Sequence, residues 1–119
     1  MKDRRSIISF KNAFDGIVSA YKTEKHLRFH FLVTLFIVII GFIFKLNRFE
    51  WMSILIVIGL VIQAELLNTA IEKLLDYTKP EIHPKAKIIK DMAAGAVLTA
   101  SIIAAIVGII IFLPKLLLL

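Results

Sequence analysis

The stretch that decides the fold is MAAGAVLTASIIAAIVGIIIFLP, residues 92–114. It contains 23 consecutive residues without a charge, and about 20 apolar residues are enough for a helix to cross a bilayer. Across the 119-residue chain, 59% of the residues are hydrophobic and the mean hydropathy is +0.85. Soluble domains are usually about 45–50% apolar. The composition therefore excludes a compact water-soluble enzyme and predicts a single integral-membrane domain, 1–119.

Two further apolar segments precede this stretch. The first, FHFLVTLFIVIIGFIF, covers residues 29–44, and the second begins at Trp51 and continues without a break into the helix-favouring ELLNTAIEKLLD. Pro80 and Pro84 mark the polar segment that follows, because proline interrupts helices. We therefore expect a loop over residues 77–91. The three expected transmembrane helices lie at about 29–45, 51–75 and 92–114.

Residues 1–28 predict an amphipathic helix on the membrane surface. Apolar residues recur at steps of three and four, which places them in one stripe along a helix; they are Ile7, Phe10, Phe14, Ile17 and Tyr21. Charged residues occupy the other side, as in helices that lie in the membrane interface. We expect no secretory signal, because the charged region runs to Arg28 and no small-residue cleavage site follows the apolar stretch.

The positive charges are unevenly distributed around these spans. The chain has 15 Lys and Arg and 9 Asp and Glu, a net charge of +6. Twelve of the cations precede the first span or lie between Lys73 and Lys90. Cytoplasmic segments of membrane proteins are enriched in Lys and Arg, so we expect the N-terminal helix and the 77–91 loop in the cytoplasm and the C-terminus outside. Cations in these places face lipid head groups, and no nucleic-acid partner is expected.

Acidic and amide side chains share one face of the second span. At 100° per residue they fall within an arc of about 80°; they are Glu65, Asn68, Glu72 and Asp76. A rise of about 1.5 Å per residue from Trp51 places Glu65 about 21 Å into a hydrocarbon core roughly 30 Å thick. An unpaired carboxylate at that depth costs a few kcal/mol. Glu65 is therefore a candidate functional residue, whereas Glu72 emerges at the cytoplasmic boundary.

Further candidates come from the neighbouring segments. Glu24 continues the apolar stripe three residues after Tyr21, and the pair Lys90 and Asp91 lies at the cytoplasmic end of the third span. Two carboxylates beside a lysine suit Mg²⁺ and a nucleotide, and the deeper Glu65 suits a base toward a lipid hydroxyl. The chain has no cysteine and no Gly-Lys pair, so neither a thiolate nucleophile nor an ordinary P-loop is available.

Three segments resemble the small prokaryotic diacylglycerol kinase family. They are FKNAFDGIVSAYKTEKHLRFH (10–30), QAELLNTAIEKLLD (63–76) and HPKAKIIKDMAAGAVL (83–98). The resemblance covers nearly the whole chain and implies an all-α homotrimer of three-span subunits, each with a surface helix, with active sites shared between subunits. It also implies a multi-pass protein of the bacterial cytoplasmic membrane that transfers the γ-phosphoryl group of Mg-ATP to a membrane alcohol.

The resemblance further implies residue roles. Glu65 matches the general base, and Glu24 and Glu72 match the magnesium carboxylates. Positions that resemble the family's nucleotide contacts are Asn12, Glu81, His83, Lys90 and Asp91, and Asn68 matches a polar organiser of the site. The segment 83–98 looks like the undecaprenol kinases of Gram-positive bacteria, so we expect undecaprenol as the acceptor, with diacylglycerol as the alternative.

Other interpretations of the same residues remain open. Intramembrane carboxylates also line ion paths, so a small channel or ion-coupled transporter is a rival, and a scaffold with a basic cytoplasmic face is a third class. Glu24 could form a surface ion pair with a neighbouring cation. His26 and His30, four residues apart, could bind zinc only with a third ligand.

Overall fold

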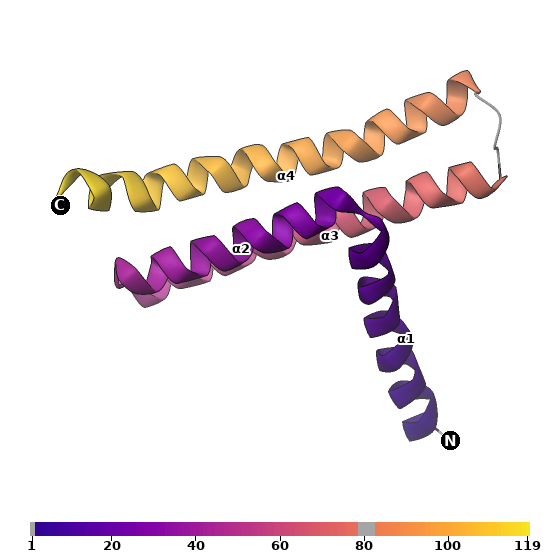
Figure 1. The fold of residues 1–119 in the computed structure, drawn as a ribbon, viewed down its shortest axis with the longest axis horizontal. Helices are drawn as coiled ribbons and strands as arrows, with labels where there is room; N and C mark the ends of the chain where they lie inside the picture. Colours follow the sequence, from indigo (N-terminus) through magenta and orange to yellow (C-terminus); the bar gives the residue numbers. More distant parts are fainter. Residues whose placement is uncertain (1, 79–82) are drawn as a thin grey trace.

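The computed structural model of the protein describes residues 2–78 and 83–119. These residues form four α-helices, α1 (Lys2–Thr23), α2 (Lys25–Ile43), α3 (Arg48–Thr78) and α4 (Pro84–Leu117). Figure 1 shows α2, α3 and α4 running along one another, with α1 projecting from the start of α2 at a steep angle. The central helix is α3, which contacts the other three. Within the described residues, α2, α3 and α4 are each long and apolar enough to cross a membrane, so the predicted all-α membrane fold with three spans is confirmed.

The structure corrects the extent of the expected loop over residues 77–91. The helix α3 continues to Thr78, and α4 already begins at Pro84, so residues 84–91 are helical. Proline suits the first turn of a helix, where its missing N–H needs no partner. The side chain of His83 caps this helix by accepting a hydrogen bond from the Lys85 backbone N–H at 3.1 Å. Both α3 and α4 therefore extend beyond their apolar segments into the polar segment between them.

The surface helix expected over residues 1–28 is interrupted at Glu24. This residue has an extended backbone, with φ −115° and ψ 111°, and separates α1 from α2. Arg28 Nη1 donates to the carbonyl oxygens of Tyr21 and Lys22, both at 2.9 Å. These are carbonyls that the last turn of α1 leaves without helical partners. The guanidinium group on α2 thus stabilises the bend, and residues 25–28 belong to the first span.

A tight turn joins α2 to α3. Lys45 adopts the left-handed conformation (φ 54°) that commonly ends a helix, and the Leu46 N–H donates to the Gly41 carbonyl at 3.1 Å. Asn47 and Glu50 then form a reciprocal capping box at the start of α3, with side chain to backbone distances of 2.8 and 3.0 Å. This turn sets the register of the antiparallel pair α2 and α3.

We expect Gly41→Ala to destabilise this hairpin. A Cβ at Gly41 would lie 2.6 Å from Trp51 Cη2 and 3.1 Å from Leu46 Cδ1. Overpacking costs about 1–3 kcal/mol, more than the gain of up to about 1 kcal/mol from replacing a helical glycine. Thermal unfolding in detergent should therefore show a lower midpoint for Gly41→Ala. The matched control is Gly59→Ala, whose Cβ meets no atom within 4 Å; a lower midpoint for this control alone would contradict the prediction.

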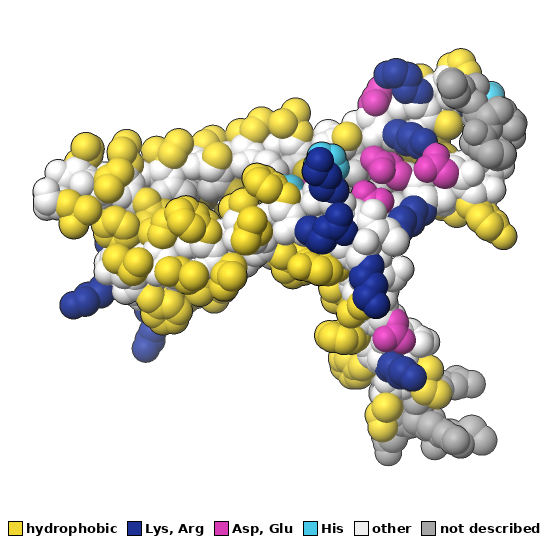
Figure 2. All heavy atoms as spheres, in the orientation of Figure 1, with side chains coloured by type: hydrophobic (Ala, Val, Ile, Leu, Met, Phe, Trp, Pro, Cys, Tyr) yellow, Lys and Arg dark blue, Asp and Glu magenta, His cyan; other side chains and the backbone are white. Residues whose placement is uncertain are grey.

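Side-chain chemistry separates the two ends of the helical bundle. Figure 2 shows hydrophobic side chains covering much of the surface of α2, α3 and α4 on the visible face, with acidic and basic side chains gathered where α1 meets the bundle and beyond. Large apolar residues face outward along the spans, such as Ile56 at 61% and Ile110 at 66% exposure. An outer surface of this kind suits lipid or another helix. We call the end that carries Glu24, Glu72 and Lys90 the polar end.

Candidate active site

The buried carboxylate of Glu65 lies near the middle of α3. Glu65 is only 6% exposed, and its Oε1 lies 3.2 Å from Nε2 of His30 on α2. A buried charged group requires such a partner, because it has lost its hydration. This contact was not predicted from the sequence, where His30 was considered as a zinc ligand. The pairing could have been predicted from distances along the chain. His30 lies 17 residues before Asn47, in the α2–α3 turn, and Glu65 lies 18 residues after it, so antiparallel helices bring the two residues to the same level.

Asn68 and Glu72 continue the face of Glu65 toward the polar end. Asn68 Nδ2 donates to Glu72 Oε1 at 3.3 Å, and both residues are half-buried. Asn68 Oδ1 is buried and has no hydrogen-bond partner among the residues that the structure describes. The amide therefore orients one carboxylate oxygen of Glu72 and retains a free acceptor of its own.

Glu24 lies level with Glu72 along the antiparallel helices. Glu24 lies six residues before His30, and Glu72 lies seven residues after Glu65. These steps correspond to about 9 Å and 10.5 Å in the same direction. A hydrogen bond from Lys73 Nζ to Thr23 Oγ1 joins the sequence neighbours of the two carboxylates. Glu24 lies at the bend before α2, so the prediction that it continues the apolar stripe of the N-terminal helix is wrong.

The donor set at Glu24 and Glu72 fits magnesium. Mg²⁺ commonly takes one or two protein carboxylates and completes its six positions with phosphate oxygens and water. Glu72 keeps one carboxylate oxygen free of the Asn68 hydrogen bond, and Glu24 is half-buried with no side-chain cap hydrogen bond to α2. Over residues 2–78 and 83–119, no group of three or more His, Asp or Glu side chains could hold a metal ion.

Lys90 connects α4 to the acidic face of α3. Its Nζ lies 2.6 Å from Asp76 Oδ1, so Asp76, which the sequence placed on the same stripe as Glu65, acquires a partner. Asp91 instead pairs with Lys87 on α4 at 2.7 Å, and both of those side chains are exposed. The structure therefore brings Lys90 toward α3 and leaves Asp91 outside this contact.

Two other residues predicted to contact nucleotide, Asn12 and His83, form no hydrogen bond or ion pair with this cluster among the described residues. Asn12 is exposed on α1, about 16 Å along the helix from Thr23. His83 is exposed and caps α4. Glu81 lies outside the described residues. Their contacts with nucleotide stay predictions.

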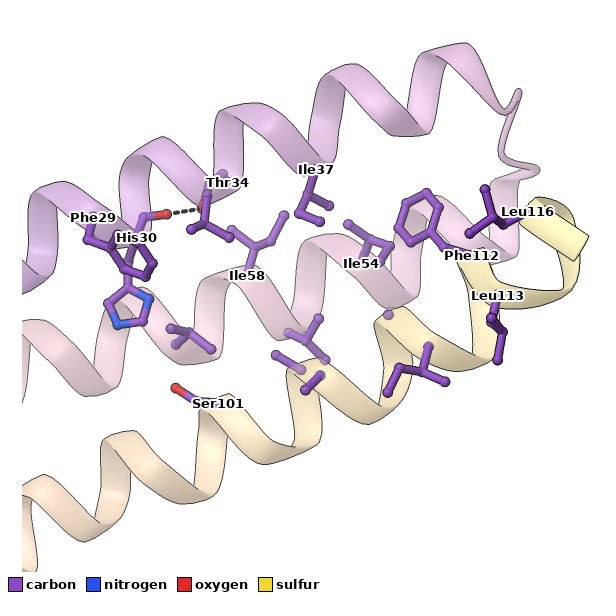
Figure 3. Close-up of a pocket in the computed structure, with 17 residues that line it drawn as sticks. Phe29, His30, Thr34, Ile37, Ile54, Ile58, Ser101, Phe112, Leu113 and Leu116 are labelled. Atoms are coloured by element: carbon purple, nitrogen blue, oxygen red, sulfur yellow. Dashed lines mark hydrogen bonds between the residues drawn. The ribbon is translucent and has the colours of Figure 1, made fainter.

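An apolar groove of about 520 Å³ runs between α2, α3 and α4 (Figure 3). It extends from His30, near the polar end, to Leu116 near the C-terminus. The polar side chains that line the groove are the imidazole of His30 and the hydroxyl groups of Thr34 and Ser101. Because His30 also contacts Glu65, one end of the groove lies beside the buried carboxylate. A long hydrocarbon chain with a polar head matches this combination.

Comparison with known proteins identifies the family. The family model described as "Prokaryotic diacylglycerol kinase" matches residues 11–112. An undecaprenol kinase of Bacillus subtilis (strain 168) is 44% identical over 108 residues, which cover 91% of this chain and 88% of that protein. A diacylglycerol kinase of Synechocystis sp. is 38% identical over 93% of this chain and 64% of that protein. A diacylglycerol kinase of Helicobacter pylori (strain J99) is 34% identical over 69% of this chain and 64% of that protein. The chain therefore belongs to the prokaryotic diacylglycerol kinase family and is a membrane-embedded lipid kinase.

Proposed function

We propose that the protein transfers the γ-phosphoryl group of Mg-ATP to undecaprenol and produces undecaprenyl phosphate. Support for this acceptor is the 44% identity to an undecaprenol kinase over 91% of the chain, against 38% and 34% to two diacylglycerol kinases. Diacylglycerol is the alternative acceptor, since both of those other relatives are named diacylglycerol kinases. The family match favours phosphoryl transfer over the channel and scaffold interpretations.

Glu65 is the general base in this proposal. The observation that carries the assignment is its burial in contact with His30, which lines the apolar groove. The lipid O–H bond breaks as the hydroxyl oxygen bonds to the γ-phosphorus, and the proton passes to the Glu65 carboxylate. The bond from the γ-phosphorus to the β,γ-bridging oxygen breaks, and ADP leaves with that electron pair.

Glu24 and Glu72 hold the magnesium ion of the nucleotide. When bound, Mg²⁺ neutralises charge on the phosphate oxygens and fixes their geometry. Asn68 orients Glu72 through its hydrogen bond. Lys90 adds positive charge for the transferring phosphoryl group, and Asp76 holds Lys90 in place. The remaining nucleotide contacts are assigned to Asn12, Glu81, His83 and Asp91 by the family resemblance.

The subunits assemble as a homotrimer with shared active sites. Two observations support this arrangement: large apolar side chains are exposed along the spans, and α1, the helix that contains Asn12, projects away from the other three helices (Figure 1). A neighbouring subunit could receive that residue. The polar end faces the cytoplasm of the bacterial cell, where ATP is available, and the C-terminus lies outside. The distribution of Lys and Arg supports this orientation.

The acceptor is tested with purified protein, labelled ATP and magnesium in mixed micelles that contain either undecaprenol or diacylglycerol. We expect label in undecaprenyl phosphate, with a higher kcat/KM for undecaprenol than for diacylglycerol. A preference for diacylglycerol would overturn the acceptor assignment and keep the kinase. Transfer to neither alcohol, together with ion flux through reconstituted vesicles, would favour a channel.

A further inference from the structure

We propose that His30 is a positioning residue for the Glu65 base. His30 Nε2 lies 3.2 Å from Glu65 Oε1, and the two side chains are 20% and 8% exposed. The inference rests on the proposed role of Glu65 as base. His30 itself takes no part in bond making or breaking; it holds one oxygen of the carboxylate.

The surrounding charges leave His30 as the partner that orients this carboxylate. Two lysines nearer the polar end are engaged elsewhere: Lys73 donates to Thr23, and Lys90 pairs with Asp76. Within the part of the chain that the structure describes, the polar side chain found in contact with the Glu65 carboxylate is that of His30, at 3.2 Å. A carboxylate has two oxygens, so a contact at Oε1 leaves Oε2 available to accept a proton.

The position of His30 also explains why this orientation bears on the reaction. His30 lines the apolar groove and its imidazole projects from α2 toward α3 (Figure 3). One ring therefore borders both the groove and the Glu65 carboxylate. A lipid alcohol that enters along the groove meets the base at the imidazole, where the orientation of the carboxylate decides whether the hydroxyl proton is within reach.

The first test compares His30→Leu with His30→Gln. Leucine keeps the apolar surface of the groove but removes the N–H group, whereas the glutamine amide restores a donor at similar reach. We expect kcat to fall by about 10- to 100-fold for His30→Leu and by less than about fivefold for His30→Gln. The KM for ATP should change by less than about twofold in both variants. A residue that serves only to pack an apolar groove would tolerate leucine better, so the reverse order of activities would overturn the proposal.

The second test repeats His30→Leu in a Glu65→Gln background. If His30 acts through Glu65, the second substitution should lower the residual kcat by less than about threefold. If His30→Leu lowers kcat by the same factor in the Glu65→Gln background as in the parent protein, the positioning role is overturned. The double variant also removes the unpaired buried charge that could prevent His30→Leu from folding, and size-exclusion chromatography monitors assembly. A Glu65→Gln protein as active as the parent would refute the base assignment itself, and so separates the two failures.

His26→Leu is the matched control for both tests. His26 lies one turn before His30 on α2 and is exposed. Its substitution therefore removes an imidazole from the same helix and leaves the contact between His30 and Glu65 in place. We expect parental kcat and KM. A loss equal to that of His30→Leu would show that the effect does not depend on the contact with Glu65, and would contradict the proposal.

Discussion

Glu65→Gln should lower kcat by about 100-fold or more, because general-base catalysis commonly contributes about 10²–10⁴-fold. The amide has nearly the same shape as the carboxylate but cannot accept the hydroxyl proton. The nucleotide contacts lie two turns away at Glu72, so binding of Mg-ATP should persist. The measurement is transfer of label from ATP to undecaprenol at saturating substrates, with ATP binding measured separately.

The control for this prediction is Glu50→Gln, in the first turn of the same helix. Glu50 pairs with Lys115 on α4 at 3.1 Å, so its substitution alters a charged contact of α3 that lies far from the proposed site. We expect at most a lower unfolding midpoint and no loss of kcat beyond about threefold. Turnover of Glu65→Gln within that same range would remove the base assignment.

Glu72→Gln should raise the magnesium concentration required for half-maximal activity by about tenfold, as expected when a cation loses one of two carboxylate ligands. The glutamine oxygen can still accept the hydrogen bond that Asn68 Nδ2 donates to Glu72 Oε1, so the local structure should remain intact. The measurement is a magnesium titration of kinase activity at fixed ATP. An unaltered magnesium requirement would mean that Glu72 does not bind the ion.

The spans were predictable because their physical signal is strong. Long uncharged runs have few alternatives to a membrane helix, and α2, α3 and α4 each contain one. The helix ends were harder to predict, since α4 begins at Pro84 in a polar segment that resembles a loop. The bend at Glu24 carries no proline or glycine; it depends on contacts made after folding, such as the hydrogen bonds of Arg28 to α1 and the complete burial of Leu27.

The site was predictable along one helix and not between helices. A helical period of 100° per residue is enough to place Glu65, Asn68 and Glu72 on one face. The contacts of His30 with Glu65 and of Lys90 with Asp76 depend on the register between helices, which for α2 and α3 is set by the turn at Lys45. Counting outward from the α2–α3 turn would have paired His30 with Glu65, because antiparallel neighbours lie at similar distances from their turn.

Whether Glu24 and Glu72 bind one metal ion can be measured by electron paramagnetic resonance with Mn²⁺ in place of Mg²⁺, in the presence of ATP. We predict that Glu24→Gln and Glu72→Gln each weaken binding of Mn-ATP by about tenfold or more, and that Glu50→Gln leaves it unchanged. Parental affinity for Mn-ATP in both variants would contradict a shared site at the polar end.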